Sequence, residues 1–333
     1  MIATPKTISR IVPDSLHSMS GVSLKKKYLL LMLHGGLGDQ LSMYFGALSL
    51  ANASNRYLVV SRWTIDKTHA GSPYGILDLI PEDVQVEYHQ KLFHRIQMSL
   101  HRRISGFFRP RVDEERFFRI KLTLDRLVST VNNVVGYDYR LADPAYVLDE
   151  IEKLKRRKSI RLNCYWPSFT DSGNLEIDLT LPGLLKENHR VQSEEYAIVH
   201  FRVGDIFDLY ASRGVLGVNY YRTCVEKILE LEPGLKILAV SDNLERAKFF
   251  YGDLPLNWIE DSDQFDASVI LKILVNSKIL VTANSGLSFW AGKLGVSISK
   301  VLAPAYPTKN DLLTGATYEP IRSNWLLINN DFL

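Results

Sequence analysis

The residues best suited to chemistry follow the apolar run 197–199, where a buried strand is expected to end. They are His200, Arg202, Gly204 and Asp205. In open α/β sheets, ligands bind beyond the carboxyl ends of the strands, and an arginine placed there offers a planar set of donors that matches phosphate oxygens. The segment therefore predicts a site for an anionic ligand.

Each of these side chains has two interpretations. Arg202 either pairs with a diphosphate, offsetting the charge that develops on a departing phosphate, or forms a structural salt bridge with Asp205. His200 either orients a ribose or a base, or is a hydrogen-bonded core histidine. Asp205 either clamps the loop or acts as a general base. Gly204 permits a turn directly after the arginine.

Two further polar segments follow expected strands and precede expected helices. Residues 241–243 (Ser-Asp-Asn) include Asp242, and these side chains either cap the next helix or contact ligand. Asn284 and Ser285 stand at an equivalent place later in the chain. There a hydroxyl and the free amides of a helix N-terminus predict an anion cradle, a role compatible with a simple N-cap by Ser285.

A glycine-rich segment, 35–40 (GGLGDQ), lies in the first half of the chain. Gly36 and Gly38 match the start of a dinucleotide-binding fingerprint, but Leu41 occupies the place of the third glycine. A nicotinamide site is therefore disfavoured. The glycines either allow a tight turn with close packing or let the backbone approach a ligand.

Residues 261–263 (Asp-Ser-Asp) match the DxD pattern with which some nucleotide-sugar enzymes bind a divalent ion. The match is weak, because Asp263 or Asp266 is equally suited to cap the helix expected to follow. Arg202 and a helix N-terminus already supply positive potential for a diphosphate. We therefore expect no metal.

Apolar runs that alternate with helical patterns predict a doubly wound α/β fold with parallel sheets. The first half contains a strand over 28–33, a helix over 41–53 and a strand over 57–61, and later helices over 145–158 and near 181–187. The second half is expected to contain strands over 196–202, 236–240, 256–259, 279–283 and 298–303, and helices over 219–231, 244–251, 266–276 and 287–294. We predict a flexible extension (1–27), an N-terminal domain (28–190) and a C-terminal domain (191–333).

Composition narrows the function classes. The formal charge of +3 over 333 residues gives no case for nucleic-acid binding. The two cysteines, Cys164 and Cys224, are expected to be buried free thiols in a reducing compartment. Without a secretory signal or an apolar run long enough to span a bilayer, a cytoplasmic location is expected. The basic-aromatic segment 92–122 is either a solvated helical pair or a surface for an anionic lipid headgroup or a sugar-phosphate acceptor.

Several motifs, in order and spacing, resemble the family-11 α-1,2-fucosyltransferases of the wider fucosyltransferase superfamily. Residues 35–40 resemble the family's GGLGNQ, and residues 200–205 fit its HxRxGD signature. Residues 214–216 and 219–221 are similar to the segment that follows this signature, residues 241–242 match an SD pair, and residues 283–292 resemble ANSSFSWWGA. Asp39, Val203 and Phe289 depart from the family pattern, which has Asn, Arg and Trp there.

The resemblance implies a GT-B architecture, in which two Rossmann-like domains face each other across a cleft. The domain 28–190 would lie on the acceptor side, and the domain 191–333 would bind the GDP-sugar. It implies metal-independent, inverting transfer of fucose from GDP-fucose, with no cofactor, to the 2-hydroxyl of a galactoside in a surface polysaccharide. Arg202 would hold the diphosphate, His200 the nucleoside, Asp266 the guanine and Ser285 a phosphate. Asp39 and Asp205 compete for the role of base. The partners implied are GDP-fucose and an oligosaccharide or lipid-linked glycan, with peripheral membrane contact. The alternatives are another GDP-sugar, another fucosyl linkage, or a non-catalytic GDP-sugar or glycan-binding protein.

Overall fold

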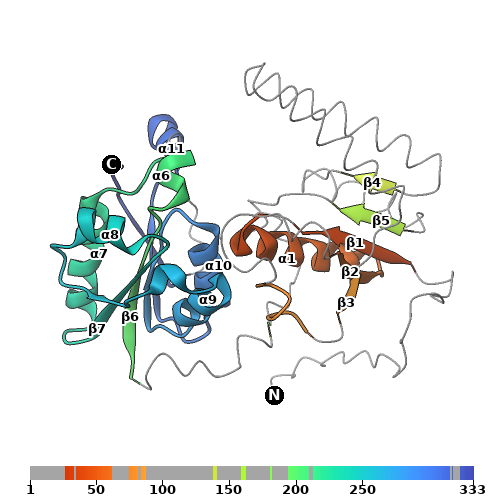
Figure 1. Ribbon diagram of the computed structural model, residues 1–333, viewed down its shortest axis with the longest axis horizontal. Coiled ribbons are helices and arrows are strands. Elements are labelled where there is room, and N and C mark those ends of the chain that lie inside the picture. The colour runs from red at the N-terminus through yellow and green to blue at the C-terminus, as the bar shows by residue number, and fades with distance from the viewer. Residues whose placement is uncertain are drawn as a thin grey trace.

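The chain forms two parallel β-sheets, each with helices packed on it (Figure 1). The computed structural model describes residues 27–33, 35–61, 75–81, 84–87, 138–140, 159–162, 181, 194–209, 213–315, 317 and 323–333. The strands of the first sheet all precede those of the second in the chain. The predicted α/β class with parallel sheets is confirmed.

The first sheet is built around a strand that is apolar on both faces. Leu29, Leu30 and Leu31 are almost completely buried, which is the pattern of a central strand in a parallel sheet. The sheet order is β3-β2-β1-β5-β4, and every pairing is parallel. Its strands are β1 (Tyr28–Met32), β2 (Tyr57–Ser61), β3 (Gln85–Glu87), β4 (Asp138–Arg140) and β5 (Ser159–Leu162). The strand predicted over 57–61 is confirmed to the residue.

Helix α1 (Leu37–Ala53) begins four residues before the start predicted from the sequence. The prediction was wrong there because the three glycines of segment 35–40 suggested a loop. Gly36 is instead the N-cap residue, with extended backbone (φ −71°, ψ 172°), and Gly38 lies in the first helical turn. The chain bends just before the helix at Gly35, whose positive φ of 78° favours glycine.

The second sheet has six strands in the order β11-β10-β9-β6-β7-β8. Strand β6 is central, β7 and β8 follow on one side, and β9 to β11 lie on the other, as in Rossmann sheets that bind nucleotides. All pairings are parallel. The strands are β6 (Tyr196–Phe201), β7 (Lys236–Ser241), β8 (Asn257–Trp258), β9 (Ile279–Val281), β10 (Lys300–Pro304) and β11 (Trp325–Ile328). The pattern did not predict β11.

Helices cover both faces of this sheet. Side chains of β6 alternate between the faces, so that Ile198 packs with α9 (Ala267–Val275) and α10 (Gly286–Leu294). Val199 packs with α7 (Val218–Leu231) and α8 (Leu244–Tyr251) on the opposite face. These four helices agree with prediction within one residue at either end. The sequence did not reveal α6 (Asp205–Leu209), α11 (Lys309–Thr314) or the short 3-10 helix η3 (Ser262–Gln264).

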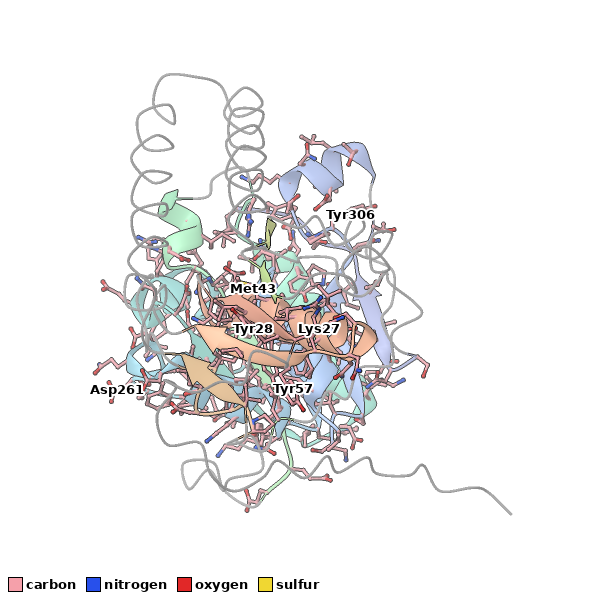
Figure 2. All side chains as sticks on the ribbon, turned by 90° about the vertical axis from the view of Figure 1, so that its right-hand side faces the viewer. Lys27, Tyr28, Met43, Tyr57, Asp261 and Tyr306 are labelled. Atoms are coloured by element: carbon pink, nitrogen blue, oxygen red, sulfur yellow. The ribbon has the colours of Figure 1, made fainter. Side chains whose placement is uncertain are left out.

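Helices α1 and α10 join the two sheets (Figure 1). Phe45 of α1 stacks on Trp290 of α10 with ring centroids 4.8 Å apart, and the indole N–H of Trp290 donates to the hydroxyl of Ser42 across 2.7 Å. One continuous apolar cluster contains residues of α1, α9, α10 and both sheets. Helix α1 is consequently buried on nearly every side, and Met43 lies in the interior (Figure 2).

Several sequence predictions lie outside the described residues. These are the extension 1–27 apart from Lys27, the segment 92–122, the helices over 145–158 and near 181–187 (of which only Leu181 is described), Cys164, and the domain boundary near residue 190. Cys224 is a buried free thiol, as expected, and burial raises its pKa. Within the described ranges, no helix combines the length and apolarity needed to cross a membrane.

Candidate functional site

The candidate site lies at the carboxyl edge of the second sheet. Strand β6 pairs in parallel with both β7 and β9, so the segments that leave these three strands emerge side by side. They carry Arg202, Asp242 and the pair Asn284–Ser285, which the sequence placed in three separate motifs. The chain runs outward in opposite directions from β6 and β9, and such a switch point is where open α/β sheets bind ligands.

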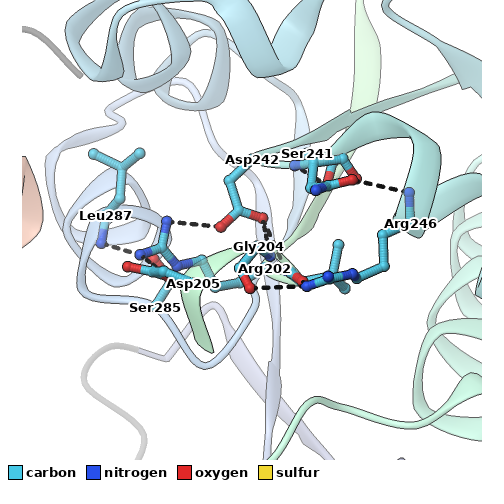
Figure 3. Close-up of polar contacts among 10 residues, drawn as sticks. Arg202, Gly204, Asp205, Ser241, Asp242, Arg246, Ser285 and Leu287 are labelled. Carbon is cyan, nitrogen blue, oxygen red and sulfur yellow. Dashed lines mark hydrogen bonds and ion pairs between the residues drawn. The ribbon is translucent and has the colours of Figure 1, made fainter. Parts of the chain in front are cut away.

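Arg202 forms ion pairs with two carboxylates (Figure 3). Its Nη2 atom lies 2.6 Å from Oδ1 of Asp205, and its Nη1 atom lies 2.9 Å from Oδ2 of Asp242. The salt bridge to Asp205 was one of the two interpretations of the sequence, whereas the pair with Asp242 was not foreseen. Because the Arg202 side chain is 34% exposed, the guanidinium remains accessible from solvent.

Asp242 holds the loop that follows β6. Its Oδ1 atom accepts hydrogen bonds from the backbone N–H groups of Val203 (2.8 Å) and Gly204 (3.0 Å). A Cβ atom on Gly204 would lie 2.7 Å from Oδ2 of Asp242, so this close approach requires a glycine. Asn243 caps α8, because its side chain accepts from the N–H of Arg246. Of the residues 241–243, which were expected to cap the helix or contact ligand, Asn243 is the cap. Asp242 instead holds the loop after β6 in place.

Arg246, which was not predicted from the sequence, binds the carbonyl groups of the same loop. Its Nη1 atom donates to the carbonyl oxygens of Val203 (3.0 Å) and Gly204 (3.2 Å), and its guanidinium lies 4.7 Å from the ring centre of Phe207. Two side chains from the segment after β7 therefore engage both the donors and the acceptors of one short stretch. The sequence feature that could have indicated this role is the position of Arg246, a charged residue in the first turn of the helix after β7.

His200 is buried at the end of β6, with 3% of its surface exposed. Burial and, to a smaller extent, the nearby charge of Arg202 together lower its pKa to about 3, so the ring is neutral at physiological pH. Its Nδ1 atom is buried and has no hydrogen-bond partner among the described residues. The side chain is therefore a core histidine whose Nδ1 atom the described residues leave without a hydrogen bond. Contact with a nucleoside stays a prediction.

Asn284 and Ser285 connect β9 to α10. The hydroxyl of Ser285 accepts from the N–H of Leu287 across 3.3 Å, which makes Ser285 the N-cap that the sequence predicted. Asn284 donates through Nδ2 to the carbonyl oxygen of Gly214 (2.7 Å), while its Oδ1 atom is buried without a partner among the described residues. The two side chains therefore fix the start of α10 at the sheet edge.

The glycine segment of the first half meets the start of α10. A Cβ atom on Gly38 would lie 2.5 Å from backbone atoms of Gly286 and Leu287, so this glycine permits close packing of α1 on α10. Gly36 is exposed, and a Cβ atom there would have no neighbour within 4 Å. Asp39 lies in the first turn of α1, beside Gly35. The packing interpretation holds for Gly38, and ligand approach stays a prediction for Gly36.

The aspartates of the DxD pattern make protein contacts. Asp263 accepts from the N–H of Leu244 across 3.2 Å and so caps α8, not the helix expected to follow it. Asp261 has a φ of 59° and accepts from the side chain of Gln264; it lies at the rim of the molecule (Figure 2). Asp266 precedes α9, is exposed and makes no capping bond with its side chain. In the part of the chain described, no three His, Cys, Asp or Glu side chains are grouped to hold a metal ion.

No protein-family model and no curated protein sequence matches this chain. A family 9 glycosyl transferase from Veillonella parvula DSM 2008 has a similar structure, with a TM-score of 0.50 and 11% identity over 92% of this chain and 87% of that chain. A variant of FUT1 from Arabidopsis thaliana in complex with GDP gives 0.49 and 14% over 86% and 71%. Fucosyltransferase NodZ from Bradyrhizobium gives 0.43 and 13% over 83% and 94%. The family 9 likeness and the two parallel sheets establish that the chain has the GT-B fold predicted from its sequence.

Proposed function

We propose that the chain is a glycosyltransferase that transfers L-fucose from GDP-fucose to a glycan hydroxyl. The observation that carries the proposal is the meeting of two motifs at one switch point. Arg202 of the HxRxGD segment leaves β6, and Ser285 of the Ala-Asn-Ser segment begins α10 after the neighbouring strand β9. Both motifs resemble those of the α-1,2-fucosyltransferases, and both present groups that bind phosphate.

The reaction needs a site that binds the diphosphate and stabilises it as it leaves. Arg202 supplies a guanidinium that is accessible from solvent, and the N-terminus of α10 supplies backbone N–H groups and the hydroxyl of Ser285. Hydrogen-bond donors held in place around the leaving diphosphate stabilise the negative charge that develops on it in the transition state, and so lower the barrier to transfer. In this proposal, Asn284 orients that helix start, and His200 and Asp266 contact the nucleoside.

An acceptor hydroxyl attacks the anomeric carbon of the β-linked fucose from the side opposite GDP, and an α-fucoside results. A carboxylate is needed to accept the proton of that hydroxyl. Asp39 and Asp205 remain the two candidates. Asp39 lies one residue after Gly38, which packs against the start of α10, and Asp205 is ion-paired with Arg202. The 2-hydroxyl of a galactoside is the proposed acceptor, and no metal or further cofactor takes part.

The test is a transfer assay with GDP-fucose or another GDP-sugar as donor and lactose or lacto-N-biose as acceptor, with and without EDTA. Released GDP and the linkage of the product are measured. We expect product with GDP-fucose alone, an α-1,2 linkage and no effect of EDTA. Product from another GDP-sugar, a different linkage or inhibition by EDTA would each correct the corresponding part of the proposal.

Arg202→Ala is expected to lower turnover about 100-fold or more at saturating GDP-fucose, because one lost charge-stabilising donor commonly has this cost. The control is Arg222→Ala, which removes an exposed arginine from α7 on the opposite face of the sheet and should leave turnover unchanged. Binding of GDP without any turnover in the wild type would instead make the chain a binding protein. Full turnover by Arg202→Ala would remove the arginine from the mechanism.

A further inference from the structure

Two carboxylates share the guanidinium of Arg202, and their charges together exceed that of the arginine. Asp205 pairs with Nη2 and Asp242 with Nη1. A diphosphate brought to this group would meet both the cation and two anions at short range, and like charges at such separations repel. Binding of an anion at Arg202 therefore requires that one of the two carboxylates moves away from the guanidinium. The other contacts of each carboxylate determine which one moves.

Asp242 is fastened by more than the arginine. Its Oδ1 atom accepts from two backbone N–H groups, those of Val203 and Gly204, while Oδ2 faces Arg202. Its side chain is 20% exposed. Moving this carboxylate would leave two backbone donors without an acceptor, which is costly in a partly buried loop. Asp242 therefore stays in place when a ligand arrives.

Asp205 is held by the arginine alone, so far as the described residues show. Its Oδ1 atom lies 2.6 Å from Nη2 of Arg202. No other group among the described residues donates a hydrogen bond to this atom. Its side chain is 32% exposed, more than that of Asp242. A rotation of the Asp205 side chain would free Nη2 without disturbing the backbone. The pair joins two side chains that are 34% and 32% exposed, so water can solvate both groups once they separate and loss of the pair costs little.

We infer that the two carboxylates have different roles toward a diphosphate ligand. Asp242 is a positioning residue that keeps Nη1 of Arg202 fixed and the loop after β6 in place. Asp205 is an exchangeable counter-ion, whose place at Nη2 a phosphate oxygen takes. This inference rests on the proposed function, because it assigns a diphosphate to Arg202. It also means that Asp205 is released when the donor binds, and only then becomes available to an acceptor.

The two roles predict opposite effects of the same isosteric change. Asp205→Asn removes a competing anion and should tighten the binding of GDP about two- to fivefold, which corresponds to the free energy of an exposed ion pair. Asp242→Asn removes the same charge but loosens the guanidinium, so GDP should bind several-fold more weakly. Asp242→Ala, which also removes the acceptor for two N–H groups, should weaken binding by about tenfold or more.

The experiment is isothermal titration of the full chain with GDP and, separately, with inorganic pyrophosphate at fixed salt concentration. The control is Glu230→Gln, which removes one exposed carboxylate from an ion pair with Lys227 on α7 and should not change either affinity. Unfolding curves show whether Asp242→Ala is folded; if it is not, Asp242→Asn carries the comparison. Tighter binding by Asp205→Asn and weaker binding by Asp242→Asn support the inference.

Affinity changes of the same direction in the two Asn variants would overturn the inference, because both carboxylates would then act alike. This outcome leaves the proposed function intact, since the wild type still binds GDP. Absence of binding of both GDP and pyrophosphate by the wild type would overturn the proposed function and the inference together. Turnover gives a further distinction: Asp242→Asn should lower kcat as well as donor affinity, because a misdirected Arg202 no longer faces the leaving group.

Discussion

The indole N–H of Trp290 donates a hydrogen bond of 2.7 Å to the hydroxyl of Ser42, which lies 248 positions earlier in the chain. Trp290 is 1% exposed and stacks on Phe45, so this bond is made within an apolar cluster. The Ser42 hydroxyl in turn donates to the carbonyl oxygen of Gly38 across 3.2 Å. A polar contact therefore joins α1 to α10 within this apolar cluster and fixes the register of the two helices.

Ser42→Ala is expected to destabilise the chain by about 1–3 kcal/mol, because the buried N–H of Trp290 would lose its acceptor. The free energy of unfolding in urea measures the effect. Ser49→Ala is the matched control on the same helix. The Ser49 hydroxyl is buried and has no hydrogen-bond partner among the described residues, so its removal should be neutral or stabilising. Equal losses in both variants would show that the Trp290 bond adds nothing specific.

Gly38→Ala should destabilise the contact between α1 and α10 by about 1–3 kcal/mol, the usual cost of overpacking a core. The added Cβ atom would lie 2.5 Å from the backbone of Gly286 and Leu287, and backbone atoms cannot turn aside as a side chain can. Gly36→Ala has open space and should lose less than about 1 kcal/mol, because alanine is a poorer N-cap residue than glycine. Thermal unfolding of both variants provides the comparison, and a stable Gly38→Ala protein would mean that α1 moves away without cost.

The Gly36→Ala variant also tests whether this glycine lets the backbone approach a ligand, which the sequence left open. If the backbone of Gly36 approaches the donor, Gly36→Ala should weaken GDP binding while lowering the unfolding temperature only slightly. Unchanged affinity in this stable variant would remove Gly36 from the donor site. Gly38→Ala cannot answer the question, because its effects on packing and on binding would be mixed.

Much of the second sheet could be predicted from the sequence because its elements are locally determined. Helix α8 runs from Leu244 to Tyr251 as predicted, since Asn243 caps its start and Gly252 follows its end. Helix α1 could not be placed in the same way. Its first turn contains Gly38, a poor helix former, and only packing against α10, a segment far away in the sequence, favours the helical conformation there.

Acid should destabilise the chain through His200. Its pKa falls from an ordinary 6.5 to about 3 on folding, so below pH 6.5 the unfolded chain binds a proton that the folded chain does not. Stability contributed by the neutral ring is complete above pH 6.5 and decreases as the pH falls toward 3, by about 1.4 kcal/mol per pH unit. Between pH 7 and 5 the wild type should therefore lose about 2 kcal/mol from this residue.

His200→Asn removes this titration while keeping a polar side chain of similar size. Urea unfolding at pH 7 and at pH 5 should show a smaller loss of stability in the variant than in the wild type. The difference between the two losses is the quantity to compare, because carboxylates contribute equally to both. Identical losses would indicate that the ring of His200 is charged in the folded chain or remains accessible to water.

Ser285→Ala should have two effects. Loss of the cap on α10 should cost about 1 kcal/mol of stability, and loss of a hydroxyl from the proposed phosphate site should weaken GDP binding about three- to tenfold. Thr308→Ala is the matched control, since Thr308 caps α11 by accepting from the N–H of Asp311. It should lose the cap energy alone. A GDP affinity in Ser285→Ala equal to that of Thr308→Ala would limit Ser285 to a structural role.

The location of the candidate site could be predicted from the sequence, but the contacts between its side chains and the loop after β6 could not. Arg202, Asp242 and Ser285 each follow a strand, and the rule that ligands lie beyond the carboxyl ends of parallel strands brings them together. The partners of Asp242 could not be predicted, because they depend on β6 and β7 being neighbours and on the loop after β6 turning toward α8. Arg246 was missed for the same reason.

The joint between α1 and α10 also limits how the two sheets can move. Gly38, Ser42 and Phe45 follow one another along a single side of α1, and each meets α10. Drawing the sheets apart would expose Phe45 and Trp290 to water and leave an indole donor unsatisfied. We therefore expect a change in their relative orientation to be confined to a small roll of α1 over α10 about this line of contact.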